Sequence, residues 1–252
     1  MTGSHGRDEG QGRGFDEVHS VDRFASGVGE SEISGLPLLG SGRTADVYAL
    51  DDGWVLRRHR EGWDTRREAE LMTYVHGHGY PVPRVRPVTG PLPGDLVMER
   101  LAGPTQAEAA LRGEVSPVDA GHELGLLLRQ LHALPPRSAG QVLHLDLHPE
   151  NVIRTPRGPV VIDWANAEEG APALDWAMSA LILAEIAVAP DRPEAAAVGT
   201  ALTALLSGPR PGLAGALEEA RARRTANPAL GPAEKQRLGA AVELVRAEEA
   251  GC

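Results

Sequence analysis

The segment between residues 140 and 164 constrains the fold most, because short β-like runs alternate there with polar side chains. Asp146 follows the run Val-Leu-His-Leu, and Asn151 lies five residues later, where the next short strand should begin. A Pro-Arg-Gly-Pro turn at 156–159 then leads into Val-Val-Ile and delivers Asp163. Such a hairpin returns Asp163 to the end where Asp146 and Asn151 lie. The spacing therefore predicts that two carboxylates and one amide oxygen converge.

Oxygen ligands of this kind suit Mg²⁺, which is usually held by one or two carboxylates together with substrate phosphates. His144 and His148 could in principle bind zinc instead. However, a His-x-x-x-His pair on an extended or turning chain does not aim both rings at one point, and Cys252 is the only cysteine. The residues favour magnesium over zinc, and His148 and Glu150 are expected to shape the turn.

Residues 36–104 have the pattern of a small, mostly antiparallel β-lobe with one helix. Strands are expected at 36–40, on both sides of the turn signal Asp-Asp-Gly at 51–53, at 85–88 and within 94–103.

The one helix of this lobe is expected to begin after Asp64 or Thr65, either of which can cap it, and to end at the glycines 77 and 79. Its spacing places three residues on one face and two beside them: Ala69, Met72 and His76, flanked by Leu71 and Val75.

Residues 105–252 are expected to be mainly helical. Ser116 is a candidate N-cap with Asp119 three residues later. The buried stripe of that helix comprises Leu124, Leu127, Leu128 and Leu131. The run from Pro172 to Ala189 predicts a helix buried on nearly all sides. Further helices are expected at about 193–206, 211–224 and 232–249. Asp175 and His132 are expected to be structural rather than catalytic.

Composition narrows the possible partners and compartment. The formal charge of −10 argues against non-specific nucleic-acid binding, which needs cationic groups. The longest apolar stretch, 177–189, is interrupted by Glu185 and is too short to span a bilayer. Residues 1–35 read as a mobile tail without the pattern of a signal peptide. We therefore expect a cytoplasmic protein that binds neither membrane nor nucleic acid.

The order His144-x-Asp146-x-x-x-x-Asn151, followed by Ile-Asp-Trp around Asp163, resembles the aminoglycoside phosphotransferase and choline kinase-like family. This resemblance extends over about 36–183 and implies an α+β, two-lobed protein-kinase-like fold. The N-lobe, 36–104, would bind ATP or GTP, and the C-lobe, 105–252, would carry the catalytic and acceptor-binding residues.

The resemblance also assigns roles to residues of the C-lobe. Asp146 would orient the substrate hydroxyl and accept its proton. Asn151 and Asp163 would hold Mg²⁺ against the nucleoside triphosphate, and His144 would support the loop.

In the N-lobe, the resemblance places backbone amides of Gly40 and Gly42 over the phosphates, with Ala45 at the position of a third glycine. Arg57 stands where the family has a lysine that contacts the phosphates; Lys235 is the only lysine among 25 basic residues, so arginine is the general choice here. Glu68 is expected to pair with Arg57, with Glu70 as the alternative.

The adenine would be held by backbone groups of a hinge between the lobes. The residues that match this hinge include Met98, Glu99 and Leu101.

The resemblance implies a small-molecule alcohol as the acceptor, and a C-lobe that is short for this family suggests that the acceptor is small. Glu168, Glu169 and Glu185 are candidates for an acidic pocket, which would suit an amino-bearing, cationic acceptor. The alternative is a nucleotide-binding pseudokinase or regulatory module, suggested by Arg57 and Ala45. A protein kinase is disfavoured, because no Ala-Pro-Glu segment follows the metal strand.

Overall fold

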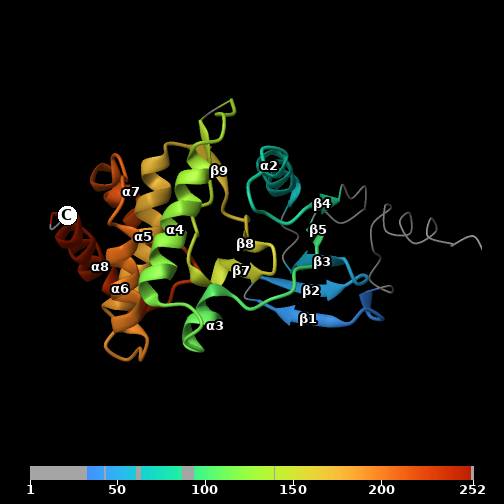
Figure 1. Cartoon of the computed structure of the whole chain (residues 1–252), viewed down its shortest axis with the longest axis horizontal. Helices are drawn as coiled ribbons and strands as arrows, with labels where there is room; N and C mark the ends of the chain where they lie inside the picture. The colour runs from blue at the N-terminus through green and yellow to red at the C-terminus, as the bar shows by residue number, and fades with distance from the viewer. Residues whose placement is uncertain (1–32, 43, 61–63, 87–93, 139, 251–252) are drawn as a thin grey trace, which may run out of the picture.

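The computed structural model describes residues 33–42, 44–60, 64–86, 94–138 and 140–250. The expected tail at 1–35 lies outside these residues except for its last three. In Figure 1 the strands of the first part of the chain gather at one end of the molecule, and the helices of the second part gather at the other. This is the two-lobed arrangement expected from the sequence.

An antiparallel sheet with the strand order β1-β2-β3-β5-β4 forms the first lobe. Its strands are β1 Leu38–Ser41, β2 Ala45–Ala49, β3 Trp54–His59, β4 Val85–Arg86 and β5 Asp95–Glu99. The turn at 51–53 is closed by the Gly53 N–H, which donates to the Asp51 carboxylate at 2.7 Å. The β2–β3 register sets Val47 opposite Arg57. The expected hairpin is confirmed, and it carries Arg57 into the interior.

Helix α2, Arg66–Gly77, is the predicted helix of this lobe, but it buries a different face. The buried residues are Glu68, Leu71, Met72 and Val75, whereas His76 is exposed. Of the residues expected to share one face, Met72 is buried and Ala69 packs on the core, but His76 is exposed, and the expected flanking residues Leu71 and Val75 are buried instead. The buried set follows the i, i+3, i+4, i+7 pattern and includes the larger apolar side chains, whose burial is more favourable than that of alanine or histidine.

The second lobe contains most of the helices and four short strands, which form two two-stranded sheets. The helices are α3 Gln106–Leu111, α4 Pro117–His132, the short 3₁₀ helix η1 Pro149–Asn151, α5 Pro172–Ala187, α6 Ala195–Leu205, α7 Leu213–Ala226 and α8 Pro232–Ala250. The strands are β6 Gln141–Leu143, β7 Val152–Thr155, β8 Gly158–Val161 and β9 Glu168–Gly170. Strand β7 pairs with β8, and β6 pairs with β9.

Two of these elements were not expected. Helix α3 has a complete capping box, in which Thr105 accepts from the Glu108 N–H and the Glu108 carboxylate accepts from the Thr105 N–H. That Thr-x-x-Glu signal was present in the sequence. Strand β9 is three residues long and forms only because it pairs with β6.

The core is continuous across the two lobes. Leu71 and Val75 of α2 belong to the same buried cluster as Leu128 of α4, Trp164 and Trp176. A smaller cluster inside the sheet is centred on Leu56 and Val97. Helix α2 is therefore packed on the helical lobe as well as attached to the sheet. Within the described ranges, no helix has the length and apolar character needed to cross a bilayer.

Gly103 lies where the chain passes from the sheet to the helices. Its φ is 143°, and a Cβ there would lie 2.0 Å from the Arg154 carbonyl oxygen. Only glycine fits this close approach. It brings the connection against β7, where Thr105 and Ile153 form a β-bridge.

Candidate active site

The loop between β6 and η1 carries Asp146. Asp175 of α5 holds this loop through hydrogen bonds to its backbone. The fully buried Asp175 carboxylate accepts the backbone N–H groups of His144 at 2.9 Å and Leu145 at 2.7 Å. It also accepts a hydrogen bond from His132 Nε2 at 2.9 Å. These bonds lower the pKa of Asp175 against the opposing effect of burial. Both Asp175 and His132 are structural, as expected.

Both ring nitrogens of His144 form hydrogen bonds within the protein. Its Nε2 donates to the Ile162 carbonyl at 3.0 Å, and its Nδ1 accepts the Asp146 N–H at 3.3 Å. Burial lowers the pKa of His144, and the ring packs edge-on against Trp164. His144 thus links the loop to the end of β8 and has no nitrogen left for zinc. Among the described residues, no group of three or more His, Cys, Asp or Glu side chains could hold a metal ion.

Asp146 and Asn151 lie together, as the spacing predicts. The Asn151 amide nitrogen donates to the Asp146 carbonyl at 2.8 Å and lies 3.5 Å from its carboxylate. Burial raises the pKa of Asp146 to about 6, and the negative charge of Asp163 acts in the same direction. The nearby charges of His144 and Arg224 oppose this rise. Asp146 is therefore a carboxylate poised to take up a proton near neutral pH.

Asp163 follows β8 and lies on the same side of the site. The Ile162 N–H donates to the Asn151 carbonyl at 3.0 Å, which ties the end of β8 to the Asn151 turn. Asp163 itself has a φ of 61°, a left-handed backbone conformation that is uncommon outside glycine, and its side chain is half exposed. This conformation presents the carboxylate to solvent beside the loop.

Arg57 of β3 contacts the carboxylates of Glu68 and Asp163. Its guanidinium forms a buried ion pair with Glu68 of α2, and Nη1 lies 3.6 Å from Asp163 Oδ1. The pairing that the sequence predicts for Glu68 is therefore present, and Glu70 is exposed. Burial raises the pKa of Glu68, whereas the Arg57 charge lowers it.

The turn between β1 and β2 carries the two glycines. The Gly42 N–H donates to the Ala45 carbonyl at 2.9 Å, and Ser41 donates to Asp46 at 2.6 Å. A Cβ at Gly40 would meet no atom within 4 Å, and one at Gly42 would lie 3.5 Å from a backbone oxygen. Packing of the folded chain therefore leaves room for a side chain at both positions.

The hinge candidates are positioned at the end of β5 and after it. The Glu99 carboxylate pairs with Arg157 at 2.6 Å and with Arg84 at 3.3 Å, so its side chain links the sheet to the β7–β8 turn. Met98 packs on the main core. Among the described residues, no hydrogen bond engages the Leu101 N–H, which leaves it available to a base.

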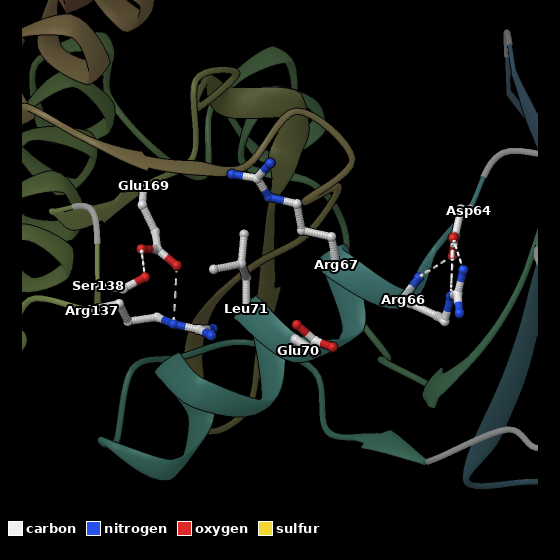
Figure 2. Close-up of a pocket in the computed structure, with 8 residues that line it drawn as sticks. All are labelled: Asp64, Arg66, Arg67, Glu70, Leu71, Arg137, Ser138 and Glu169. Atoms are coloured by element: carbon white, nitrogen blue, oxygen red, sulfur yellow. Dashed lines mark hydrogen bonds and ion pairs between the residues drawn. The ribbon is translucent and has the colours of Figure 1, made fainter.

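The three acids predicted to form an acidic acceptor pocket are each held by an arginine. Glu185 pairs with Arg224 at 2.8 Å, and Glu168 pairs with Arg223 at 2.9 Å. Figure 2 shows Glu169, which pairs with Arg137 at 3.2 Å and accepts from Ser138. The sequence offered no signal for these partners.

Two cavities lie beside α2 rather than against Asp146. One of about 520 Å³, drawn in Figure 2, is lined by Asp64, Arg66, Arg67, Glu70, Leu71, Arg137, Ser138 and Glu169. The other, of about 340 Å³, is lined by Asp64, Arg67, Glu68, Ala165 and Ala167. The second cavity therefore lies next to the segment that follows Asp163.

Comparison with known proteins places these features in one family. A model of the phosphotransferase enzyme family (APH) matches residues 35–142 and 135–214. No curated protein sequence matches the chain significantly.

Solved structures of similar fold share little sequence with the chain. A thermostable mutant of aminoglycoside phosphotransferase APH(4)-Ia is 14% identical, with a TM-score of 0.55 over 88% of this chain and 96% of that one. A choline/ethanolamine kinase family protein from Mesorhizobium loti is 17% identical, with a TM-score of 0.54 over 86% and 92%. The amicoumacin kinase hAmiN is 13% identical, with a TM-score of 0.53 over 94% of each chain. At these identities the likeness shows the fold, which is protein-kinase-like.

Proposed function

Because this chain belongs to the phosphotransferase enzyme family, we propose that it transfers the γ-phosphoryl group of ATP or GTP to a hydroxyl of a small molecule. In this proposal residues 36–104 bind the nucleotide, and residues 105–252 supply the catalytic loop and the acceptor site. The observation that carries it is the meeting of Asp146, Asn151 and Asp163 beside the Arg57–Glu68 ion pair.

Asp146 is the proposed catalytic base. It orients the acceptor hydroxyl and takes its proton as the oxygen bonds to the γ-phosphorus, while the bond from that phosphorus to the bridging β–γ oxygen breaks and the nucleoside diphosphate leaves. A carboxylate with a raised pKa is suited to accepting that proton near neutral pH.

Asn151 and Asp163 fit the ligand set of Mg²⁺. The Asn151 amide nitrogen is engaged by the loop, which leaves its oxygen for a cation, and the Asp163 carboxylate is half exposed. When bound, Mg²⁺ would neutralise charge on the nucleotide phosphates. The only cation within ion-pair distance of the Asp163 carboxylate, among the described residues, is Arg57 at 3.6 Å.

Arg57, Gly40 and Gly42 are the proposed phosphate contacts, with Glu68 holding the Arg57 guanidinium in place. The backbone of the hinge residues Met98, Glu99 and Leu101 would receive the base.

The test is a phosphorylation screen of metabolites and antibiotics with ATP and GTP, using wild-type protein and Asp163→Ala. We expect transfer to at least one alcohol by the wild-type protein and a loss of at least about 100-fold in the variant, because the variant lacks a metal ligand. Transfer at equal rates by both proteins would contradict the assignment of Asp163.

A pseudokinase is the second candidate, and the replacement of lysine by Arg57 is the observation that favours it. Arginine presents a planar fork rather than a compact ammonium and is not equivalent at a phosphate site. Nucleotide binding without transfer to any acceptor in the same screen would support this alternative.

A further inference from the structure

Glu168, Glu169 and Glu185, the acids expected to form an acceptor pocket, are each compensated by an arginine inside the protein. The Glu185–Arg224 pair joins α5 to α7 through two hydrogen bonds of 2.8 Å, from Nε and Nη2 of the guanidinium. Both side chains are almost buried, with exposed fractions of 7% for Glu185 and 11% for Arg224. A two-bond arginine–carboxylate pair of this kind is geometrically defined and leaves no net charge.

The other two acids follow the same pattern. Arg223 contacts both Glu168 and Glu219 at 2.9 Å, and Arg137 pairs with Glu169. Glu168 and Glu169 belong to β9, which begins five residues after Asp163 and pairs with β6, the strand that leads to the Asp146 loop. The Glu168–Arg223 pair is therefore tied through β9 and β6 to the Asp146 loop, whereas the Glu169–Arg137 pair lines the cavity beside α2.

Arg224 is also within electrostatic reach of the catalytic loop. Its positive charge lowers the pKa values of Asp146 and His148, although burial is the largest influence on both. A cationic acceptor placed beside Asp146 would meet this guanidinium, and Glu185 would already be occupied by it.

We propose that the acceptor of the phosphotransfer proposed above is an uncharged, polyhydroxylated molecule, and that the Arg224–Glu185 pair disfavours polycations. A carboxylate that is already paired with an arginine attracts a polycation less than an unpaired one, because the guanidinium repels the incoming charge. The more exposed Glu168–Arg223 pair still offers N–H donors and carboxylate lone pairs, which match neighbouring hydroxyl groups.

The first measurement compares acceptors of different charge. The binding of a panel of neutral monosaccharides and nucleosides, and of gentamicin, is titrated by calorimetry against the wild-type protein saturated with AMP-PNP and Mg²⁺. The same compounds are then assayed for phosphorylation. We expect at least one neutral compound to bind and react with a kcat/KM at least about 100-fold above that of gentamicin, or about 2.7 kcal/mol of discrimination. A preference for gentamicin would overturn the proposal.

The second measurement releases one carboxylate at a time. Arg224→Gln frees Glu185, and Arg223→Gln, at a more exposed pair, frees Glu168. Either change should tighten gentamicin binding by about tenfold, which is about 1.4 kcal/mol. In the double variant Arg224→Gln/Glu185→Gln the gain should disappear, because the released charge is gone.

Arg246→Gln is the matched control. Arg246 of α8 is ion-paired with Glu218 of α7 and with Glu243 of α8. It should leave gentamicin affinity unchanged. Unchanged gentamicin affinity in both the Arg224 and the Arg223 variants would overturn the role of charge compensation. Affinity is measured without turnover, so the two proposals can fail separately. The absence of transfer to any acceptor would reject the phosphotransferase function. The binding preference would still decide the charge of the ligand.

Discussion

Burial dominates the titration of Asp146; the charge of Asp163 adds to its effect, and the charges of His144 and Arg224 oppose it. The pKa of its carboxyl is about 6 in the folded protein, raised first by burial and then by the charge of Asp163. In the unfolded chain an aspartate titrates near its ordinary value, so the folded protein binds the proton more tightly. The stability contributed by this group is therefore fully present below about pH 4 and is lost as the pH rises through about 6. The proposed base catalysis needs ionised Asp146, and that ionised form is costly to folding.

Asp146→Asn tests both consequences at once. We expect phosphotransfer to fall by about 10²–10⁴-fold, because the amide cannot accept the proton. The variant should also be more stable than the wild type at pH 8, by on the order of 1–3 kcal/mol, with the difference shrinking near pH 4. Urea unfolding at the two pH values measures it. Asp191→Asn, at an exposed position, is the control that should show no such pH-dependent gain.

At the scale of the elements, the loop that carries Asp146 is shaped by a helix that follows it in the chain. Asp175, in the first turn of α5, accepts two consecutive N–H groups from the β6 end of the loop. Leu145, which donates the second of these N–H groups, has a φ of 63°. This backbone conformation costs a leucine free energy. The hydrogen bonds to Asp175 offset this cost. They fix the backbone of the two residues that precede Asp146.

Asp175→Asn should therefore destabilise the protein by about 2–4 kcal/mol, since the amide nitrogen cannot accept and would face buried N–H groups. Ser116→Ala removes the α4 N-cap and should cost only about 1 kcal/mol. The two free energies of unfolding are compared by urea titration. If the Asp175 variant loses no more than the cap variant, Asp175 does not hold the loop.

For the whole molecule, the two lobes contribute different halves of the site. Arg57 and Glu68 come from the sheet and α2, whereas Asp146, Asn151 and Asp163 come from the helical lobe. The lobes are joined by the continuous core, by the Glu99–Arg157 pair and by the contact of Arg57 with Asp163. A nucleotide that contacts both lobes would stabilise their arrangement and raise the unfolding temperature.

Thermal unfolding with ATP, with and without Mg²⁺, measures this coupling. At a free nucleotide concentration 100 times Kd we expect a stabilisation of about 2.7 kcal/mol. In Asp163→Ala the part that depends on Mg²⁺ should be lost, whereas Glu70→Ala, at an exposed position on α2, should retain it. Equal Mg²⁺-dependent shifts in both variants would contradict the metal assignment.

Local patterns in the sequence predicted most of the elements and the residues of the candidate site. Strands β2 and β3 follow from the Asp-Asp-Gly turn, and α4 follows from Ser116 and its leucine stripe, because hydrogen bonding and side-chain periodicity act over a few residues. The meeting of Asp146, Asn151 and Asp163 was predictable for the same reason, since one hairpin and one short turn separate them. Helix α3 was missed although its Thr-x-x-Glu capping signal is local.

Only the tertiary structure decided features that depend on residues far apart in the chain. Which face of α2 is buried depends on the core that it meets, and β9 exists only through its pairing with β6. Arg224 lies 39 residues from Glu185 in the sequence, and nothing local distinguishes it from the other arginines. Packing of α7 on α5 brings the two side chains together. The negative charge of Glu185, which looks unpaired in the sequence, is therefore compensated by an arginine in the folded protein.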